Sequence, residues 1–209
     1  MSVLIVDYGM SNLGSIRRSL EECEAKVLIS DDPRSLRSAV CAVLPGVGAF
    51  ADGMKNLEEK GWVPAIREEV AAKGIPLLGI CLGMQLLAGV GKEGGKRDGL
   101  GLIAGEARRL EPEGPGVRIP HVGWNEVHTV RTSPLFEGIP DGTDFYFVHG
   151  YHLVPADAGN LLATTPYCGR FASAVASGSV YGVQFHPEKS GRSGFRLLRN
   201  FLRISGAGG

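Results

Sequence analysis

Residues 75–87, IPLLGICLGMQLL, contain the turn that decides the fold. The run 75–80 is apolar on both faces, which is typical of a strand buried inside a sheet. Residues 82–88 then continue as a helix, and Gly79 and Gly83 flank the junction. Because glycine tolerates sharp turns and close backbone contacts, a strand can pass directly into a helix here. This unit indicates an α/β protein.

The first half of the chain repeats this alternation of strand and helix. Short apolar runs predict strands, and apolar residues at a spacing of three to four predict helices. The predicted strands are 3–6, 26–29, 42–44 and 75–80, and the predicted helices are 12–23, 33–37 and 54–72, the last interrupted by Gly61 and Pro64. Strands that are apolar on both faces and separated by helices favour a parallel sheet covered on each side.

The second half is richer in strand patterns separated by Gly and Pro turns, which favours antiparallel pairing. The predicted strands are 117–121, 126–130, 145–148, 161–164 and 179–185, and a last helix spans 190–204. The glycine-rich stretches 89–101 and 206–209 are expected to be loose. The predicted fold class is α/β: an open, mostly parallel sheet flanked by helices, with antiparallel strands in the second half. We expect residues 1–209 to form a single domain.

Composition excludes several classes of function. Lys plus Arg and Asp plus Glu both number 22, whereas a nucleic-acid or membrane-surface protein is usually basic. The start of the chain lacks a basic signal region, and no window approaches the roughly 20 apolar residues that a bilayer requires. The cysteines form no CxxC pair, so free thiols in a reducing cytoplasm are expected, without zinc; they are Cys23, Cys41, Cys81 and Cys168.

Cys81 has two interpretations. Gly79 to Gly83 has the form G-x-nucleophile-x-G of a strand-to-helix elbow, with a thiol in place of serine. At the first turn of the helix the macrodipole favours a thiolate, and the N–H of Leu82 can serve as an oxyanion donor. Cysteine is also often a buried, inert core residue, and Gly-x-x-x-Gly occurs in ordinary turns. This stretch alone leaves both interpretations open.

A nucleophile requires a base, and His186 has the best context among the five histidines. Pro187 keeps residue 186 extended, so the side chains of His186 and Glu188 share a face. The carboxylate can then orient the imidazole, as in a catalytic triad. A surface histidine in a proline turn is the alternative. His149 and His152 suggest a metal pair, but no carboxylate or thiol cluster accompanies them, so we expect no metal.

A third element is the loop 45–50, PGVGAF, which follows a predicted strand and exposes backbone N–H groups. Residues 7–12, this loop, Cys81 and His186 all follow predicted parallel strands. Open α/β sheets build their sites at the carboxyl ends of their strands. The convergence predicts thiol-dependent acyl transfer or hydrolysis, with the acyl donor unspecified.

The motifs PGVGAF, GICLGMQLL and FHPEKS, in that order, resemble the three signatures of class I glutamine amidotransferases, which have a flavodoxin-like fold. DYGMSNLGSI (7–16), PHVGWN (120–125) and YFVHGYH (146–152) are similar to the family of glutaminase subunits of imidazole glycerol phosphate synthase. The resemblance implies a cytoplasmic enzyme without cofactors that hydrolyses glutamine for histidine biosynthesis. It implies a heterodimer with a separate (β/α)8-barrel cyclase subunit, which uses the ammonia to form imidazole glycerol phosphate and aminoimidazole carboxamide ribotide.

The resemblance also assigns roles to individual residues. Cys81 attacks the carboxamide, and His186, oriented by Glu188, transfers protons. Backbone N–H groups of Leu82 and Val47 form the oxyanion hole, and the Val47 peptide is expected to reorient when the liganded partner activates the enzyme. The implied glutamine-binding residues are Gly48, Gln85, Glu93, His149, Gly150 and Tyr151. The implied partner contacts are Asn12, Arg18 and Trp124. Gly150 departs from the family pattern, where a side chain is more usual.

Two alternatives remain at this point. The glutaminase subunit of pyridoxal phosphate synthase shares the fold and the catalytic trio, but PHVGWN and HPEKS speak against it. A binding or regulatory module could keep the fold without catalysis, since function resides in sites rather than folds. The intact Cys81, His186 and Glu188 speak against such a module.

Overall fold

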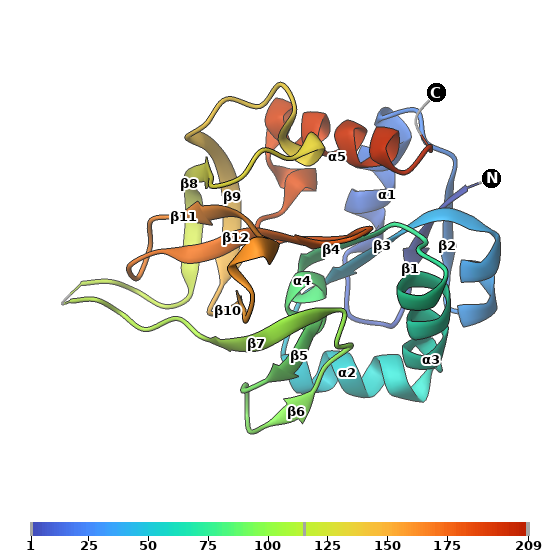
Figure 1. Ribbon diagram of the computed structural model, residues 1–209, viewed down its shortest axis with the longest axis horizontal. Helices are drawn as coiled ribbons and strands as arrows, with labels where there is room; N and C mark the ends of the chain where they lie inside the picture. Colours follow the sequence, from blue (N-terminus) through green and yellow to red (C-terminus); the bar gives the residue numbers. More distant parts are fainter. Residues whose placement is uncertain (1, 115, 208–209) are drawn as a thin grey trace.

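The computed structural model describes residues 2–114 and 116–207. Its main sheet has nine strands in the order β2-β1-β3-β4-β13-β12-β11-β8-β9 (Figure 1). The first five strands are parallel: β2 (Val27–Ser30), β1 (Ser2–Val6), β3 (Ala39–Gly46), β4 (Leu77–Cys81) and β13 (Val180–Val183). The antiparallel part comprises β12 (Phe171–Ser177), β11 (Leu161–Thr165), β8 (His121–Thr129) and β9 (Thr143–His149). The predicted parallel sheet with antiparallel strands from the second half is confirmed.

Helices cover both faces of the sheet because its strands are apolar on both faces. Val3 and Ile5 of β1 belong to the core under α1 (Leu13–Glu22) and α5 (Gly191–Ile204). Leu4 and Val6 belong to the core under α2 (Phe50–Glu59), α3 (Trp62–Ile66) and α4 (Leu82–Leu86). Figure 1 shows α1 and α5 on one side of the sheet and α2 and α3 on the other. The sheet therefore lies between two hydrophobic cores.

The shorter helical segments lie between these elements. They are the 3-10 helices η1 (Pro33–Ser38), η3 (Pro134–Phe136), η4 (Ala158–Asn160) and η5 (Pro187–Lys189), and the π-helical η2 (Arg67–Ala72).

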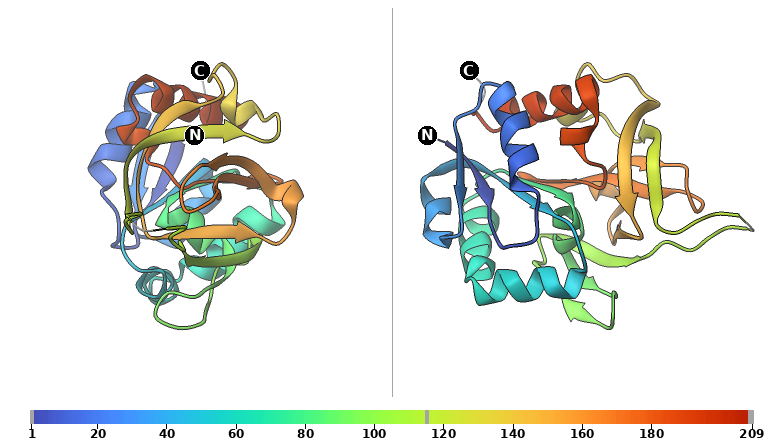
Figure 2. Two further views of the ribbon diagram at one scale, coloured as in Figure 1. Left: turned by 90° about the vertical axis from the view of Figure 1, so that its left-hand side faces the viewer. Right: turned by 180° about the vertical axis from the view of Figure 1, so that it is seen from behind.

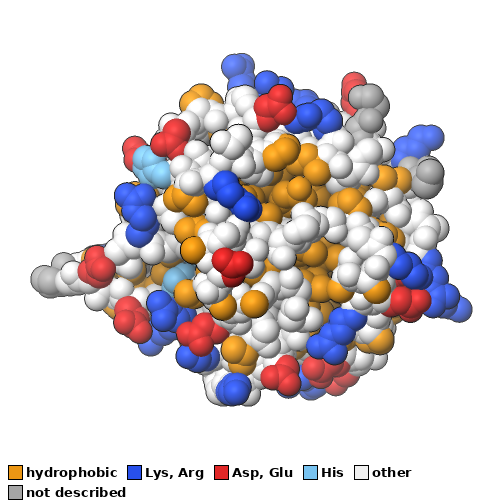
Figure 3. Space-filling view, viewed as in Figure 1, with side chains coloured by type: hydrophobic (Ala, Val, Ile, Leu, Met, Phe, Trp, Pro, Cys, Tyr) orange, Lys and Arg blue, Asp and Glu red, His pale blue; other side chains and the backbone are white. Residues whose placement is uncertain are grey.

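No helix within the described ranges is both long and apolar enough to cross a membrane. On the face shown in Figure 3, acidic and basic side chains are interspersed rather than gathered by sign.

A second, four-stranded sheet has the order β10-β7-β5-β6 and lies beside α4 (Figure 2). Its strands are β10 (Tyr151–Pro155), β7 (Ile103–Arg109), β5 (Ala88–Gly91) and β6 (Arg97–Asp98). The stretch 89–101 was expected to be loose, and that expectation is wrong for β5 and β6. Their order depends on backbone pairing with β7, which a local pattern does not reveal.

Several elements differ from the sequence prediction, the following among them. Residues 117–120 form no strand, and β8 begins only at His121. The helical region begins at Phe50 rather than at residue 54, and the predicted break at Gly61 is confirmed. Pro64 does not interrupt α3, because it lies in the first helical turn, where a missing N–H costs no intrahelical hydrogen bond.

The turn from β4 to α4 depends on close backbone contacts. A Cβ on Gly83 would lie 1.8 Å from the carbonyl oxygen of Leu44 in β3. A Cβ on Gly79 would lie 2.7 Å from the carbonyl oxygen of Gly83. Any larger residue at either position would push α4 away from the sheet. The two glycines therefore fix the place of Cys81 between them.

Replacing Gly83 with alanine tests this constraint. We expect Gly83→Ala to lower the free energy of unfolding by about 1–3 kcal/mol or more, because the new methyl group overlaps the Leu44 carbonyl. Gly14→Ala is the matched control, because Gly14 lies exposed in α1, where a Cβ would meet only Asn12 Oδ1, at 3.9 Å. That control should stabilise the chain by up to about 1 kcal/mol. Urea unfolding measures both, and an equal effect of the two changes would contradict the steric argument.

Candidate active site

Cys81 lies at the junction of β4 and α4, at the carboxyl edge of the parallel strands. Its backbone has φ +54° and ψ −110°, a conformation that L-residues rarely adopt, and the residue is only 5% exposed. Register pairs it with Gly46 at the end of β3. The strained backbone is the sharp turn that the elbow pattern predicts. Cys81 thus lies next to the loop that begins with PGVG.

His186 and Glu188 form a buried pair just after β13. The Nδ1 atom of His186 lies 2.8 Å from Oε1 of Glu188, and the two side chains are 4% and 9% exposed. The backbone N–H of His186 donates to the carbonyl of Tyr146, and the Ser190 hydroxyl donates to the His186 carbonyl. The predicted contact of His186 with Glu188 is present, but only His186 is extended: Glu188 lies in the 3-10 helix η5 rather than in an extended segment. Burial acts to lower the pKa of His186, but nearby Cys81 and Glu188 raise it to about 9.

The thiol of Cys81 has two other polar neighbours. Its Sγ atom lies 3.8 Å from the carbonyl oxygen of Val148 and 3.7 Å from Nε2 of Gln184. The Nε2 atom of His186 is buried and makes no hydrogen bond among the described residues. This nitrogen is the position from which a base must exchange a proton with the thiol. Gln184 is buried, and sequence reasoning missed it, although it lies two residues before His186.

A cavity of about 230 Å³ opens beside Cys81, smaller than the pockets that hold drug-sized ligands. The residues that line it are Val47, Gly48, Cys81, Leu82, Gln85, Glu93, Val148, His149, Gly150 and Tyr151. All except Val148 were assigned from the sequence, and the structure brings them together around one space. A larger cavity of about 640 Å³ lies near η3, but no cysteine or histidine lines it.

Gln85 and Glu93 are held by contacts that leave one oxygen of each without a protein partner. Gln85 donates through Nε2 to the Tyr151 carbonyl at 2.8 Å and to Oε1 of Gln184 at 3.2 Å. Oε2 of Glu93 accepts the N–H of Phe50 at 2.7 Å, at the start of α2. Oε1 of Gln85 and Oε1 of Glu93 make no hydrogen bond to the described residues. Both oxygens can therefore accept from an ammonium group in the cavity.

The oxyanion donors are not both directed to the cavity. Leu82 is the first residue of α4, so its N–H has no partner within the helix. The N–H of Val47 instead donates to the carbonyl of Met10 at 2.8 Å. Gly46 and Gly48 flank this residue, and Gly48 has φ +114°. In this conformation only one of the two predicted N–H donors is free for an oxyanion.

A chain of hydrogen-bonded side chains supports the cavity wall formed by His149, Gly150 and Tyr151. Nδ1 of His149 donates to the Tyr151 carbonyl at 2.9 Å, so its Nε2 must accept. The Nε2 atom then accepts from Nδ1 of His121 at 3.2 Å, and Nε2 of His121 lies 3.3 Å from Nδ2 of Asn125. All rings are neutral in this arrangement. Sequence reasoning quoted His121 within a motif but gave it no role.

Burial keeps these histidines neutral. It lowers the pKa of His121 to about 4, of His149 to about 3 and of His152 to about 4. No group of three or more metal-binding side chains is found within residues 2–114 and 116–207. The hydrogen bonds of His121 and His149 support the cavity wall.

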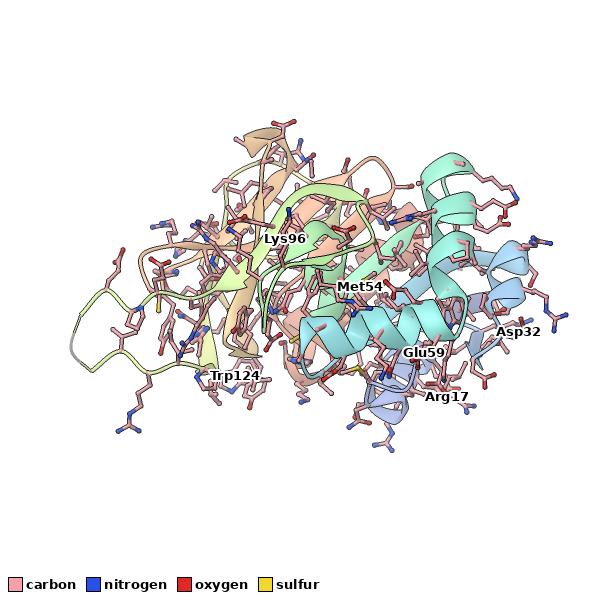
Figure 4. The ribbon with its side chains drawn as sticks, turned by 90° about the horizontal axis from the view of Figure 1, so that it is seen from below. Arg17, Asp32, Met54, Glu59, Lys96 and Trp124 are labelled. Atoms are coloured by element: carbon pink, nitrogen blue, oxygen red, sulfur yellow. The ribbon has the colours of Figure 1, made fainter. Side chains whose placement is uncertain are left out.

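The predicted partner contacts all lie on the surface. Trp124 is 57% exposed on β8. Asn12 precedes α1 as its N-cap residue, but its side chain makes no capping hydrogen bond. Arg18 is exposed on α1. In Figure 4, Trp124 and the α1 residue Arg17 lie along the same edge of the molecule.

Comparison with known proteins gives consistent matches. The sequence model of the family "Glutamine amidotransferase class-I" matches residues 4–204. Imidazole glycerol phosphate synthase subunit HisH of Moorella thermoacetica is 51% identical over 199 residues, covering 95% of this chain and 93% of that protein. The protein of that name from Aquifex aeolicus is 45% identical over 204 residues and 97% of each chain. A solved glutamine amidotransferase structure at 19% identity has a TM-score of 0.78, covering 99% of this chain and 100% of that one, which shows the same fold.

The histidine pKa values predict a stability maximum near pH 6.5. Histidines of the unfolded chain titrate near pH 6.5. Below this pH the unfolded chain therefore binds protons that His121, His149 and His152 do not bind in the folded chain. Stability should fall with falling pH, by at most about 1.4 kcal/mol per pH unit for each. His186 behaves oppositely: its contribution is complete below pH 6.5 and is lost as pH rises towards 9.

Urea unfolding of the chain between pH 5 and pH 9 measures this curve. His152→Gln should flatten the acid side by about a third, and Glu188→Gln should flatten the alkaline side, because it removes the carboxylate that favours protonated His186. A stability that rises steadily to pH 9 would show that the assigned directions are wrong.

Proposed function

This chain belongs to the class I glutamine amidotransferase family, whose members are cysteine-dependent enzymes, and we propose that its Cys81 cavity hydrolyses glutamine to glutamate and ammonia. The chain is homologous over nearly its full length to HisH, and its function is that of the glutaminase subunit in histidine biosynthesis. The observation that carries the proposed site is the buried pair of His186 and Glu188 beside Cys81 and a small cavity.

The proposed reaction assigns one task to each group. As the Cys81 sulfur bonds to the carboxamide carbon, His186, oriented by Glu188, takes the thiol proton and then gives it to the departing ammonia. A thioester remains. Water, deprotonated by His186, then cleaves the thioester and releases glutamate and the thiol. Oε1 of Glu93 and Oε1 of Gln85 accept from the ammonium group of the substrate.

The Val47 peptide supports a low basal activity. Its N–H is bonded to Met10, so the tetrahedral intermediate receives one backbone donor from Leu82 and lacks the second. Removing one oxyanion donor typically costs about 2.7–4 kcal/mol, or roughly 100- to 1,000-fold in rate. Rotation of the Gly46–Val47 peptide would release the Met10 carbonyl and complete the site. A partner that favours the rotated state would therefore activate the enzyme.

The relatives are named as subunits, so this chain acts with a partner subunit. We propose that the partner is a (β/α)8-barrel cyclase that receives the ammonia within a heterodimer, in the cytoplasm. Val122 and Trp124 are exposed on the same face of β8. In β9, Val148 pairs with Val122 and Tyr146 pairs with Trp124. The Val148 carbonyl lies against the Cys81 thiol. A partner seated on Trp124, with Asn12 and Arg18, would thus lie close to the site.

Glutamate release tests the catalytic assignment. We expect the purified chain alone to release glutamate slowly, and a large rise with the cyclase subunit and its ribonucleotide ligand. Cys81→Ala should abolish the activity, by at least about 1,000-fold, and Glu188→Gln should lower kcat roughly 100-fold or more. Cys168→Ala is the matched control, since this thiol lies outside the cavity. Equal rates for the Cys81 and Cys168 variants would exclude the proposed nucleophile.

Trp124→Ala tests the proposed interface. Large aromatic side chains at the centre of an interface typically contribute about 2 kcal/mol or more, so the Kd for the cyclase subunit should rise roughly 30-fold. Val130→Ala is the matched control, because Val130 is 53% exposed just beyond β8. Titration calorimetry measures both variants. If Val130→Ala raises the Kd and Trp124→Ala does not, the interface lies elsewhere.

A further inference from the structure

The hydroxyl of Tyr8 is buried without a partner. Tyr8 follows β1, its exposed fraction is 0%, and its hydroxyl makes no hydrogen bond within the described ranges. Buried tyrosine hydroxyls are normally hydrogen-bonded, because an unpaired polar group in a core costs stability. A phenylalanine would fill the same space without that cost. In this conformation the hydroxyl has no hydrogen-bond partner among the described residues, so we look for a partner in another conformation of the site.

The hydroxyl lies beside Gly46, the residue that precedes Val47. A Cβ on Gly46 would lie 2.1 Å from the Tyr8 oxygen and 3.0 Å from Cβ of Leu82. The Tyr8 oxygen and the Leu82 side chain thus both lie against Gly46. Burial, and then the charge of nearby Cys81, raise the pKa of Tyr8, so the hydroxyl keeps its proton and remains a donor.

After rotation of the Gly46–Val47 peptide, the Gly46 carbonyl requires a hydrogen-bond donor. In a planar trans peptide the N–H and the C=O point in opposite directions. Because the Val47 N–H now points to the Met10 carbonyl, the Gly46 carbonyl points away from it. Turning the N–H to the cavity brings the Gly46 carbonyl round to the Met10 side. The carbonyl oxygens of Met10 and Gly46 would then both lie on the Met10 side, and the Val47 N–H would no longer donate to either of them.

We propose that Tyr8 is a positioning residue whose hydroxyl donates to the Gly46 carbonyl when the peptide is rotated, and so stabilises the complete oxyanion hole. The inference rests on the proposed function, with Val47 as the second oxyanion donor. The donor is already beside Gly46, is shielded from water and has no competing acceptor among the described residues. The hydrogen bond that Val47 loses to Met10 is thereby offset by the one that Gly46 gains from Tyr8.

Tyr8→Phe removes the hydroxyl and keeps the ring. We expect the kcat of glutamate release in the ligand-activated cyclase complex to fall roughly 3- to 10-fold, the range that one net hydrogen bond corresponds to, with KM for glutamine unchanged. The loss should be larger in the complex than in the free chain. The urea midpoint should be unchanged or slightly higher, because no hydrogen bond of this conformation is removed. Tyr181→Phe, a partly buried tyrosine of β13 outside the cavity, should change none of these quantities.

A spectroscopic measurement reads the same bond directly. In a chain labelled with ¹³Cζ-tyrosine, the Tyr8 signal, assigned by its loss in Tyr8→Phe, should shift when the cyclase and its ligand are added. An unchanged kcat, an equal loss with and without the cyclase, or an unmoved signal would overturn the role of Tyr8. Failure of the proposed function would be distinct: the unmodified complex would then release no glutamate, or Cys81→Ala would release it normally.

Discussion

The contact between the Gly83 backbone and the Leu44 carbonyl constrains the rest of the site. It leaves no room for a side chain, so α4 can lie tight against β3 and β4 only with glycine at this position. This close packing turns the chain sharply enough to hold Cys81 at φ +54°. The same turn presents the Leu82 N–H at the start of α4. The nucleophile and one oxyanion donor are therefore consequences of a single steric fit.

Burial acts to lower the pKa of each of the histidines of this site, but the outcome differs between them. His121, His149 and His152 have lowered pKa values and remain neutral, which lets the first two act as one donor and one acceptor each. His186 is equally buried, yet Glu188 and Cys81 raise its pKa. A charge is thus stable only where a carboxylate accompanies it. This arrangement separates the groups that support the cavity wall from the group proposed to move protons.

The cavity in this conformation is assembled except for one peptide. Gln85, Glu93 and the wall from His149 to Tyr151 are held by hydrogen bonds, and His186 is already paired with Glu188. The Val47 N–H alone is directed elsewhere, to Met10. Because Gly46 and Gly48 flank it, this peptide has less steric resistance to rotation than its neighbours. Control of the proposed activity then requires only a small rearrangement in the loop beside the cavity.

The sequence by itself determined the features that local patterns encode. Apolar runs located the parallel strands, two glycines located the turn at Cys81, and the motif His-Pro-Glu placed Glu188 near enough to pair with His186. Family motifs supplied most of the cavity lining. Tertiary structure alone decided the contacts between distant segments: the pairing of β5 with β7, the Gln184–Cys81 contact, the His121–His149 bond and the direction of the Val47 N–H. These depend on packing and backbone hydrogen bonds between residues far apart in the chain, which no local spacing records.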